Sequence, residues 1–314
     1  MNILIDIVSP FFFLIFLGFS FGKIFSGDDS GLYWLNKFIV YLAVPSLLFS
    51  LLSKSAIEEI ANFNFIATTT LLTFVVFSVS FTYLVYLRKK RIGDSALYAA
   101  SSSFSNGGYM GVPLMVALLG DEAIIPATLV LTFDNILHFI IIPLIVGRND
   151  EGSKFSRLMF GLKELIKNPF LIASILGILV SAIDFGTPDL IVSLTDQMGQ
   201  AAIPTALFSL GLSLALSKFS VLSLDKFLLI FMKLFIHPVL VAVVIISMGI
   251  FDPVWTASAI IMASLPTALS VYMMARQYGK DAETVSSITF FGTVVSIGTI
   301  SLVIFLVDAY ILKI

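Results

Sequence analysis

The chain has 314 residues, of which 58% are hydrophobic and 12% are charged, and its mean hydropathy is +1.04. A soluble domain carries roughly 25% charged residues, so this composition excludes a soluble globular protein and predicts a helical integral membrane protein. With no cysteine, disulfides, thiolate metal sites and thiol nucleophiles are excluded, and the net charge of −2 does not point to nucleic acid as a partner.

Ten apolar stretches approach the ~20 residues that a membrane-spanning helix needs. The first lacks the basic segment of a cleavable signal peptide, so we expect it to be a spanning helix. Pro45 in the second span and Pro204 in the seventh predict kinks. The long polar connection between spans five and six has a basic helical pattern that fits a helix on the membrane surface. The ten predicted spans are about 4–25, 33–52, 65–87, 95–119, 123–147, 168–184, 189–216, 226–249, 254–277 and 285–309.

The fourth span contains the sequence SSSFSNGGYMGVPLMVALLG, in which helix-breaking residues crowd together. Asn106, Gly107, Gly108, Gly111 and Pro113 fall within eight residues. Because glycine and proline each weaken a helix, we expect a break in mid-membrane, which is how many secondary transporters build a substrate site. A kinked or tightly packed helix of small residues is the alternative interpretation.

Lysine and arginine are distributed unevenly among the predicted loops. If the N-terminus is outside, fifteen of them fall on the inner side and only Lys54 and Lys313 on the outer side, while Lys233 falls within a span. The excess of positive charge on cytoplasmic loops therefore predicts that both termini are outside.

The chain also repeats itself at an offset of 159 residues, which places Pro45 on Pro204 and Ser105 on Ser264. Five spans per copy is an odd number, so we predict that the second copy is inverted in the membrane. Inverted repeats place a substrate site near the midplane, where two broken helices meet. The predicted parts are a first repeat at 1–150, a cytoplasmic linker at 151–167 and a second, inverted repeat at 168–314.

The same offset places the second break in the ninth span, where Pro266 lies opposite Gly107. Half-helix N-termini that meet at such a crossing carry partial positive charge and favour a carboxylate. The predicted substrate-binding residues are Ser105, Asn106, Gly107, Gly108, Ser264, Pro266 and Thr267.

Few ionisable residues lie within the spans, and each is a candidate for function because its burial is costly. Asp134 and His138 are four residues apart in the fifth span, so they share one helix face and are candidates for a proton-carrying pair. A structural hydrogen bond between helices is the alternative. Lys233 and His237 have the same spacing in the eighth span, but Lys233 is near the cytoplasmic end, where snorkelling is the favoured interpretation.

Several short motifs resemble the auxin efflux carrier family, whose bacterial members include malate and malonate permease-like proteins. Their order and spacing make the resemblance specific over nearly the whole chain. The motifs are Asn36-Lys37-Phe38 with Ala43-Val44-Pro45, Asn106 with Met110-Gly111-Val112-Pro113-Leu114, Phe208-Ser209-Leu210-Gly211-Leu212, Leu265-Pro266, Ala275-Arg276-Gln277-Tyr278 and Phe291-Gly292.

The resemblance implies a scaffold domain of spans 1, 2, 6 and 7 and a transport domain of spans 3–5 and 8–10 that moves like an elevator. It also implies an organic anion bound where spans 4 and 9 cross, with Asn106 donating hydrogen bonds to a carboxylate and Pro266 marking the second break. A homodimer through the scaffold and a location in the bacterial cytoplasmic (inner) membrane follow from the same resemblance.

Two departures distinguish this chain from the plant carriers. Ser105 stands where they have a proline before the asparagine, so the first break is expected at Gly107 and Gly108. Thr69 and Thr73 stand where they have an acidic and a basic residue. These differences favour a carrier of small organic acids, such as the dicarboxylates malate and malonate, over a carrier of auxin or a similar aromatic carboxylate.

Coupling to protons or to the membrane potential is favoured, and no metal or cofactor is expected. Sodium coupling, as in the related bile-acid symporter-like fold, is the alternative, but the predicted crossing offers hydroxyls and an amide and no carboxylate. The enzyme interpretation is rejected because the two histidines are 99 residues apart, neither lies in an HExxH motif, and Asp134 is the only deeply placed aspartate. A channel or sensor is disfavoured by the inverted repeat.

Overall fold

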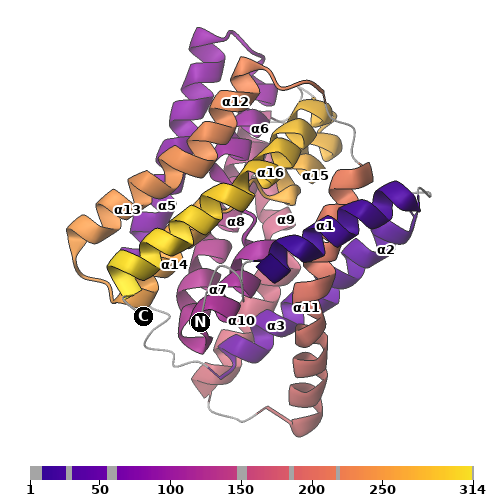
Figure 1. Cartoon of the computed structure of the whole chain (residues 1–314), viewed down its shortest axis with the longest axis vertical. Helices are drawn as coiled ribbons and strands as arrows, with labels where there is room; N and C mark the ends of the chain where they lie inside the picture. The colour runs from indigo at the N-terminus through magenta and orange to yellow at the C-terminus, as the bar shows by residue number, and fades with distance from the viewer. Residues whose placement is uncertain are drawn as a thin grey trace. The chain divides into compact units, whose positions relative to one another are not determined.

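The computed structural model describes residues 9–25, 30–54, 62–146, 154–183, 187–216 and 220–312, and all regular elements in these ranges are helical. The prediction of an all-helical membrane protein is thereby confirmed. The helices (Figure 1) are α1 (Ser9–Ile24), α2 (Ser30–Phe38), α3 (Val44–Leu52), α5 (Phe63–Thr82), α6 (Ile92–Ser103), α7 (Val112–Leu119), α8 (Ile124–Val146), α9 (Lys154–Ile166), α10 (Pro169–Ile183), α11 (Asp189–Leu216), α12 (Leu224–Phe231), α13 (His237–Met248), α14 (Pro253–Ser264), α15 (Leu269–Gln277) and α16 (Ala282–Val307).

Within the described residues, six helical stretches are long and apolar enough to cross a membrane. Three further apolar helices are shorter: α1, the segment Gly107–Leu119 and α14. The last two belong to predicted spans four and nine, which are each interrupted and so do not pass as single helices. A multi-pass membrane protein follows, whereas the count of ten spans and the inverted repeat stay predictions. The six stretches are Gly31–Leu52, Phe63–Leu87, Asp121–Val146, Asp189–Leu216, Leu224–Met248 and Ala282–Leu312.

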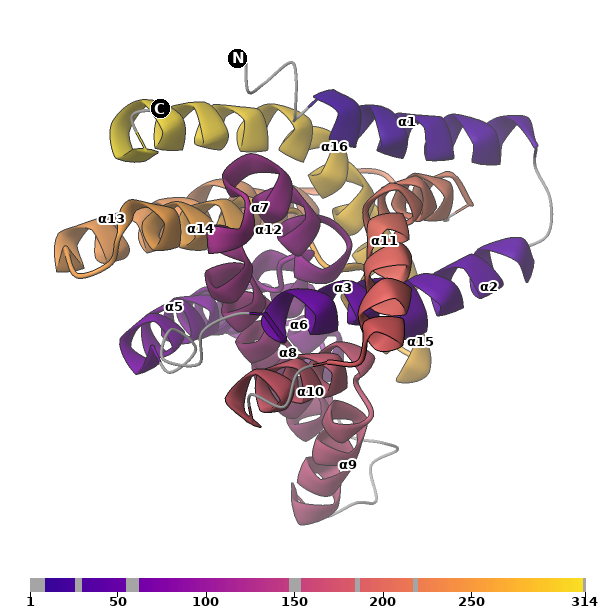
Figure 2. The same ribbon diagram turned by 90° about the horizontal axis from the view of Figure 1, so that it is seen from below.

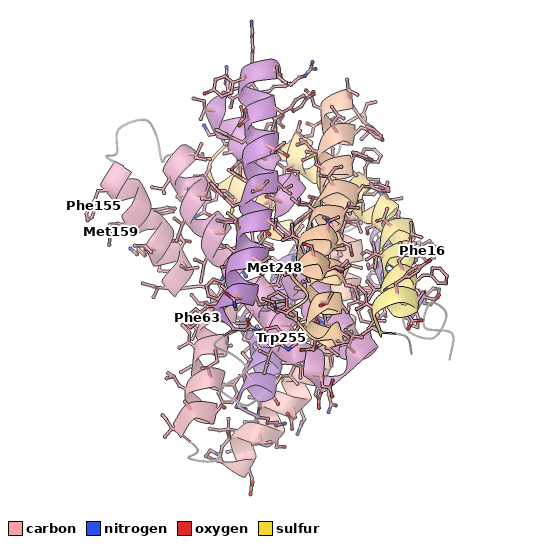
Figure 3. The ribbon with its side chains drawn as sticks, turned by 90° about the vertical axis from the view of Figure 1, so that its left-hand side faces the viewer. Phe16, Phe63, Phe155, Met159, Met248 and Trp255 are labelled. Carbon is pink, nitrogen blue, oxygen red and sulfur yellow. The ribbon has the colours of Figure 1, made fainter. Side chains whose placement is uncertain are left out.

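Large apolar side chains point away from the protein along several helices. Figure 3 shows Phe155 and Met159 directed outward from α9, where they are 71% and 47% exposed. On its packed side α9 approaches α8 so closely that a Cβ on Gly161 would lie 2.6 Å from the carbonyl oxygen of Phe139. The helical pattern predicted between spans five and six is therefore confirmed as a helix, and its place on the membrane surface stays a prediction.

Contacts between Cα atoms divide the chain into two compact units, each assembled from segments that are distant in sequence. Unit 1 contains Met1–Phe63, Gly107–Thr132 and Lys167–Ser217, and unit 2 contains Asn64–Asn106, Phe133–Ile166 and Lys218–Ile314. This division is not the predicted division into two repeats and a linker. The predicted repeats, scaffold domain and transport domain stay predictions.

Unit 1 is organised around the long helix α11, which packs against both α1 and α3 (Figure 2). The backbones of α1 and α11 nearly touch, because a Cβ on Gly18 would lie 2.0 Å from the carbonyl oxygen of Phe208. A polar contact joins α2 to the same helix, since Ser209 donates a hydrogen bond of 2.8 Å to the side-chain oxygen of Asn36. Pro204 lies inside α11, which continues through it, so this proline does not end the helix and the kink stays a prediction.

Three prolines follow π-helical segments, in which the chain makes a wider turn than an α-helix. Pro45 follows Ile39–Ala43, Pro113 follows Gly107–Gly111, and Pro238 follows Met232–Ile236. A proline ring clashes with the carbonyl four residues earlier and offers no N–H to it, and a π-helical turn removes that conflict. The third of these segments contains Lys233.

The core of unit 2 is formed by residues from α5, α6, α8, α12, α15 and α16. In Figure 1, α12 and α13 run alongside α16. At one end of the unit, the ring of Phe65 on α5 meets that of Trp255 on α14 edge-to-face, with the centroids 4.8 Å apart. Figure 3 shows Trp255 close to Met248, the last residue of α13. These contacts join α5, α13 and α14 at that end of the unit.

Candidate functional site

The helices of predicted spans four and nine are both interrupted within unit 2. α6 ends at Ser103, and Phe104, which follows it, has an extended backbone. α14 ends at Ser264, and α15 starts at Leu269 after a similar extended stretch. In a bilayer such interruptions occur only where protein or water satisfies the freed backbone groups.

The first interruption lies earlier than predicted. Gly107 and Gly108 do not form the break but begin the π-helical segment Gly107–Gly111 that leads into α7. The helix already ends at Ser103 because the residues that follow it pair with the second interrupted segment. Gly108 has a packing role instead, since a Cβ there would lie 3.0 Å from the ring of Phe170.

The two interrupted segments pair with each other through backbone hydrogen bonds. Ser105 and Thr267 form an antiparallel β-bridge. Beside it, the N–H of Asn106 donates to the carbonyl oxygen of Pro266 at 2.9 Å. The N–H of Ala268 donates to the carbonyl oxygen of Phe104, also at 2.9 Å. We call this pairing of residues 104–106 with 265–268 the crossing.

The side-chain amide of Asn106 is the unusual group at the crossing. Asn106 is only 2% exposed, and its Nδ2 has no hydrogen-bond partner among the described residues. Leaving a buried donor unpaired costs about 1–3 kcal/mol, so an orphaned amide in a native structure calls for an explanation such as a ligand.

The hydroxyls of the other predicted site residues already have partners. Thr267 donates to the carbonyl oxygen of Ser101 on α6. Ser264 donates at 2.7 Å to the carbonyl oxygen of Ile261 on its own helix. Ser105 accepts a hydrogen bond from Lys233. These three hydroxyls therefore fix the crossing, and the free hydrogen-bonding capacity lies with the amide of Asn106.

Lys233 does not snorkel to the membrane surface, which overturns the favoured interpretation. Its side chain is 1% exposed, and its Nζ donates to Ser105 Oγ at 2.8 Å and to the carbonyl oxygen of Ala263 at 2.6 Å. The same Nζ lies 3.2 Å from Nδ1 of His237. A charged residue in an apolar span is the sequence signal for a buried functional group. The position of Lys233 near the end of its span does not bring its ammonium to the membrane surface.

Asp134 reaches the crossing from α8. Its carboxylate accepts hydrogen bonds from the side chain of Thr73 on α5 and from the backbone N–H of Ser105, and it interacts electrostatically with Lys233. Thr73 is also 3.4 Å from Nε2 of His237. The prediction that the crossing has no carboxylate in its neighbourhood is therefore wrong.

His138 does not form a carboxylate–imidazole pair with Asp134. Its Nδ1 lies 2.8 Å from the backbone carbonyl oxygen of Asp134, and its Nε2 lies 2.9 Å from Ser103 Oγ. Its ring stacks on that of Phe104 with the centroids 4.2 Å apart. The four-residue spacing therefore brings His138 to the backbone of residue 134 and not to its carboxylate. The charged group that interacts with this carboxylate is Lys233.

A cavity of about 320 Å³ in unit 2 is lined by residues of α13, α14, α16 and the π-helical segments Met232–Ile236 and Asp308–Leu312, and by none of the polar groups described above. Its lining includes Val239, Ala242 and Leu302, and no charged side chain contributes to it. It therefore offers nothing to balance the charge of an anion. Among the residues that the structure describes, no group of three or more histidines and acidic residues could hold a metal ion.

Residues 3–304 match the model of a family described as membrane transport protein. The chain belongs to this family. It is 33% identical over 304 residues to a candidate malonate transporter of Rhizobium meliloti, covering 96% of this chain and 95% of the relative. It is 25% identical to an uncharacterized transporter of Methanothermobacter thermautotrophicus over 85% and 86% of the two chains. It is 22% identical to auxin efflux carrier component 5 of Arabidopsis thaliana, over 93% of each chain.

The family assignment confirms the resemblance to auxin efflux carriers that the motifs indicated. Together with the apolar helices, it establishes a multi-pass membrane transport protein and not an enzyme. The crossing, with its orphaned amide and its buried Lys233 and Asp134, is accordingly the candidate site of a transporter.

Proposed function

We propose that this protein is a secondary active transporter of small organic anions, with a dicarboxylate such as malonate or malate as substrate. The observation that carries the proposal is the buried Nδ2 of Asn106, a hydrogen-bond donor without a partner among the described residues. A carboxylate oxygen is a suitable acceptor for such an amide. The 33% identity to a candidate malonate transporter supports the same class of substrate.

The start of α15 adds to the attraction for an anion. Ala268, the residue before this helix, is extended and provides no side-chain hydrogen bond to the first turn. The first N–H groups of a helix carry partial positive charge and favour anions. Asn106 is held beside this end by its backbone hydrogen bond to Pro266, so the amide and the helix end act on the same carboxylate.

Transport would follow an elevator-type alternating access, driven by protons or by the membrane potential. The division of the chain into two compact units supports a movement of one unit relative to the other. The carboxylate of Asp134 beside Ser105 favours one further candidate, a sodium-coupled symporter of organic anions, because half-helix ends and carboxylates coordinate sodium in transporters.

Uptake into proteoliposomes tests the substrate class. Labelled malonate and malate should accumulate, with monocarboxylates and indole-3-acetate as comparisons. Asn106→Ala should raise the half-saturating substrate concentration about 10- to 100-fold, because a hydrogen bond to a charged group contributes about 1.5–3 kcal/mol.

The matched control is Asn64→Ala, the same substitution at an exposed asparagine of α5. It should leave uptake unchanged. If no organic anion is transported or competes for uptake, the proposed function fails. If uptake occurs and Asn106→Ala leaves the apparent affinity unchanged, Asn106 is removed from the site and the transporter class stands.

The proposed orientation in a bacterial inner membrane, with both termini outside, has its own test. Because the chain has no cysteine, single cysteines can be added without background. Glu122→Cys and Gln277→Cys replace exposed residues at opposite sides of the predicted topology. A membrane-impermeant maleimide applied to intact cells should label position 122 and not 277. Labelling of position 277 and not 122 would show that the orientation is the reverse, with both termini inside.

A further inference from the structure

The ammonium of Lys233 is bonded to oxygen atoms of two different segments and interacts electrostatically with a carboxylate on a third. Ser105 Oγ and the carbonyl oxygen of Ala263 accept its hydrogen bonds at 2.8 and 2.6 Å. The carboxylate of Asp134 is its electrostatic partner. Within the described residues, neither α5 nor α14 has a charged side chain, so Asp134 provides the opposing charge at this position.

The surrounding backbone also favours a positive charge here. Ser105 follows the C-terminal end of α6, and Ala263 lies in the last turn of α14. The last carbonyl groups of a helix are unpaired and carry partial negative charge. One such carbonyl, that of Ala263, accepts from Nζ of Lys233, and the other oxygen that accepts from Nζ belongs to Ser105, just beyond the end of α6. In broken-helix transporters, half-helix C-termini and unwound carbonyls are the groups that coordinate a coupling cation.

The chemistry of these groups is that of a cation site, and the cation in it is covalently attached. A hydroxyl and a carbonyl are hard oxygen ligands, which suit Na⁺ as well as an ammonium, and the nearby carboxylate of Asp134 adds a negative charge. An ammonium on a side chain is held in place by the fold, so the site does not depend on the ion concentration outside the protein.

We propose that the ammonium of Lys233 fills a cation-binding position at the crossing in place of a free Na⁺, and that removal of the ammonium leaves a site that binds Na⁺. The proposal rests on the assignment of the crossing as a transport site. It predicts that the wild-type protein works without Na⁺, and it decides against the sodium-coupled alternative.

The test measures thermal unfolding of the purified full-length protein in detergent, in NaCl, KCl or choline chloride at equal ionic strength. Lys233→Ala should gain a saturable, Na⁺-specific rise in its unfolding midpoint of at least about 3 °C, because a ligand that binds only the folded state stabilises it. The wild-type protein and Lys163→Ala, a change at an exposed lysine of α9, should show no preference among the three salts.

The double variant Lys233→Ala/Asp134→Asn should lose the Na⁺ effect, because the negative charge that attracts the cation is gone. Equal midpoints of Lys233→Ala in all three salts would refute the proposal, and so would Na⁺-specific stabilisation of the wild-type protein, which needs no variant. Lys233→Gln is used if the alanine variant does not fold, with the same expected gain. None of these measurements needs the substrate, so a failure of organic-anion uptake would remove the proposed function and leave this result standing.

Discussion

Asp134→Ala should destabilise the protein by about 3–5 kcal/mol and abolish uptake, the largest effect that we expect from one substitution at the crossing. Removing one of two buried opposite charges leaves the other without compensation, and this costs far more than their interaction itself contributes. Here the remaining charge is the ammonium of Lys233, which is 1% exposed. The N–H of Ser105 and the hydroxyl of Thr73 would lose their acceptor as well.

A double variant separates this loss of compensation from a general intolerance of the position. In Asp134→Asn/Lys233→Met neither charge remains, and the stability should return to within about 1 kcal/mol of the wild-type value, because apolar or neutral replacements of a buried pair are often neutral. Uptake should not return. Asp121→Ala, at an exposed aspartate, is the control and should have little effect.

Thermal unfolding in detergent and uptake in proteoliposomes are the two measurements. If Asp134→Ala is as stable as the wild-type protein, the carboxylate does not balance Lys233 and the electrostatic account of the crossing is wrong. If the double variant is no more stable than Asp134→Ala, the cost does not come from the unpaired ammonium, because neither charge is present in the double variant.

The sequence predicted the location of the crossing but not the residues that surround it. Glycine and proline weaken helices locally, so their crowding in the fourth span and the aligned Pro266 were enough to predict two breaks. The position of the first break was wrong by a few residues. Whether the chain leaves the helix at Ser103 or at Gly107 depends on pairing with residues 265–268, and this contact is remote in sequence.

The ionisable residues were harder to place, because depth in the membrane was judged from distance to the end of a span. By that measure Lys233 was near water. The π-helical segment Met232–Ile236 contains Lys233 and directly precedes His237 and Pro238. Lys233 and His237 still share a helix face, as their four-residue spacing predicts, since Nζ lies 3.2 Å from Nδ1. The spacing does not reveal that this face packs against Ser105 and Ala263.

For His138, the four-residue spacing predicts the contacting residue correctly but not the contacting atom. Four residues along a helix do place two residues on one face, and the contact between His138 and residue 134 exists. It is made to the backbone carbonyl, which is always present at that spacing, and not to the carboxylate. The carboxylate instead meets Ser105, 29 positions away in the chain, and no local pattern predicts such a contact.

Gly211→Leu should destabilise unit 1 by at least about 3 kcal/mol and sharply lower the yield of folded protein. A Cβ at position 211 would lie 1.9 Å from the carbonyl oxygen of Ile15, and a Cβ on Gly18 would lie 2.0 Å from that of Phe208. The atoms in the way are backbone atoms, which cannot turn aside as a side chain does. Overpacking of this kind costs about 1–3 kcal/mol when side chains can yield, and more when helices must separate.

Gly298→Leu in α16 is the matched control, because a Cβ at position 298 would meet nothing within 4 Å. There the change should be neutral or slightly stabilising, since glycine is about 1 kcal/mol worse than alanine inside a helix. The two variants add the same apolar side chain, so their difference isolates the close approach of α1 and α11 from hydrophobicity and insertion. Gly211→Leu with the yield and melting temperature of Gly298→Leu would mean that α1 is not held against α11 by backbone contact. Small residues at this contact would then serve some purpose other than letting the two helices meet.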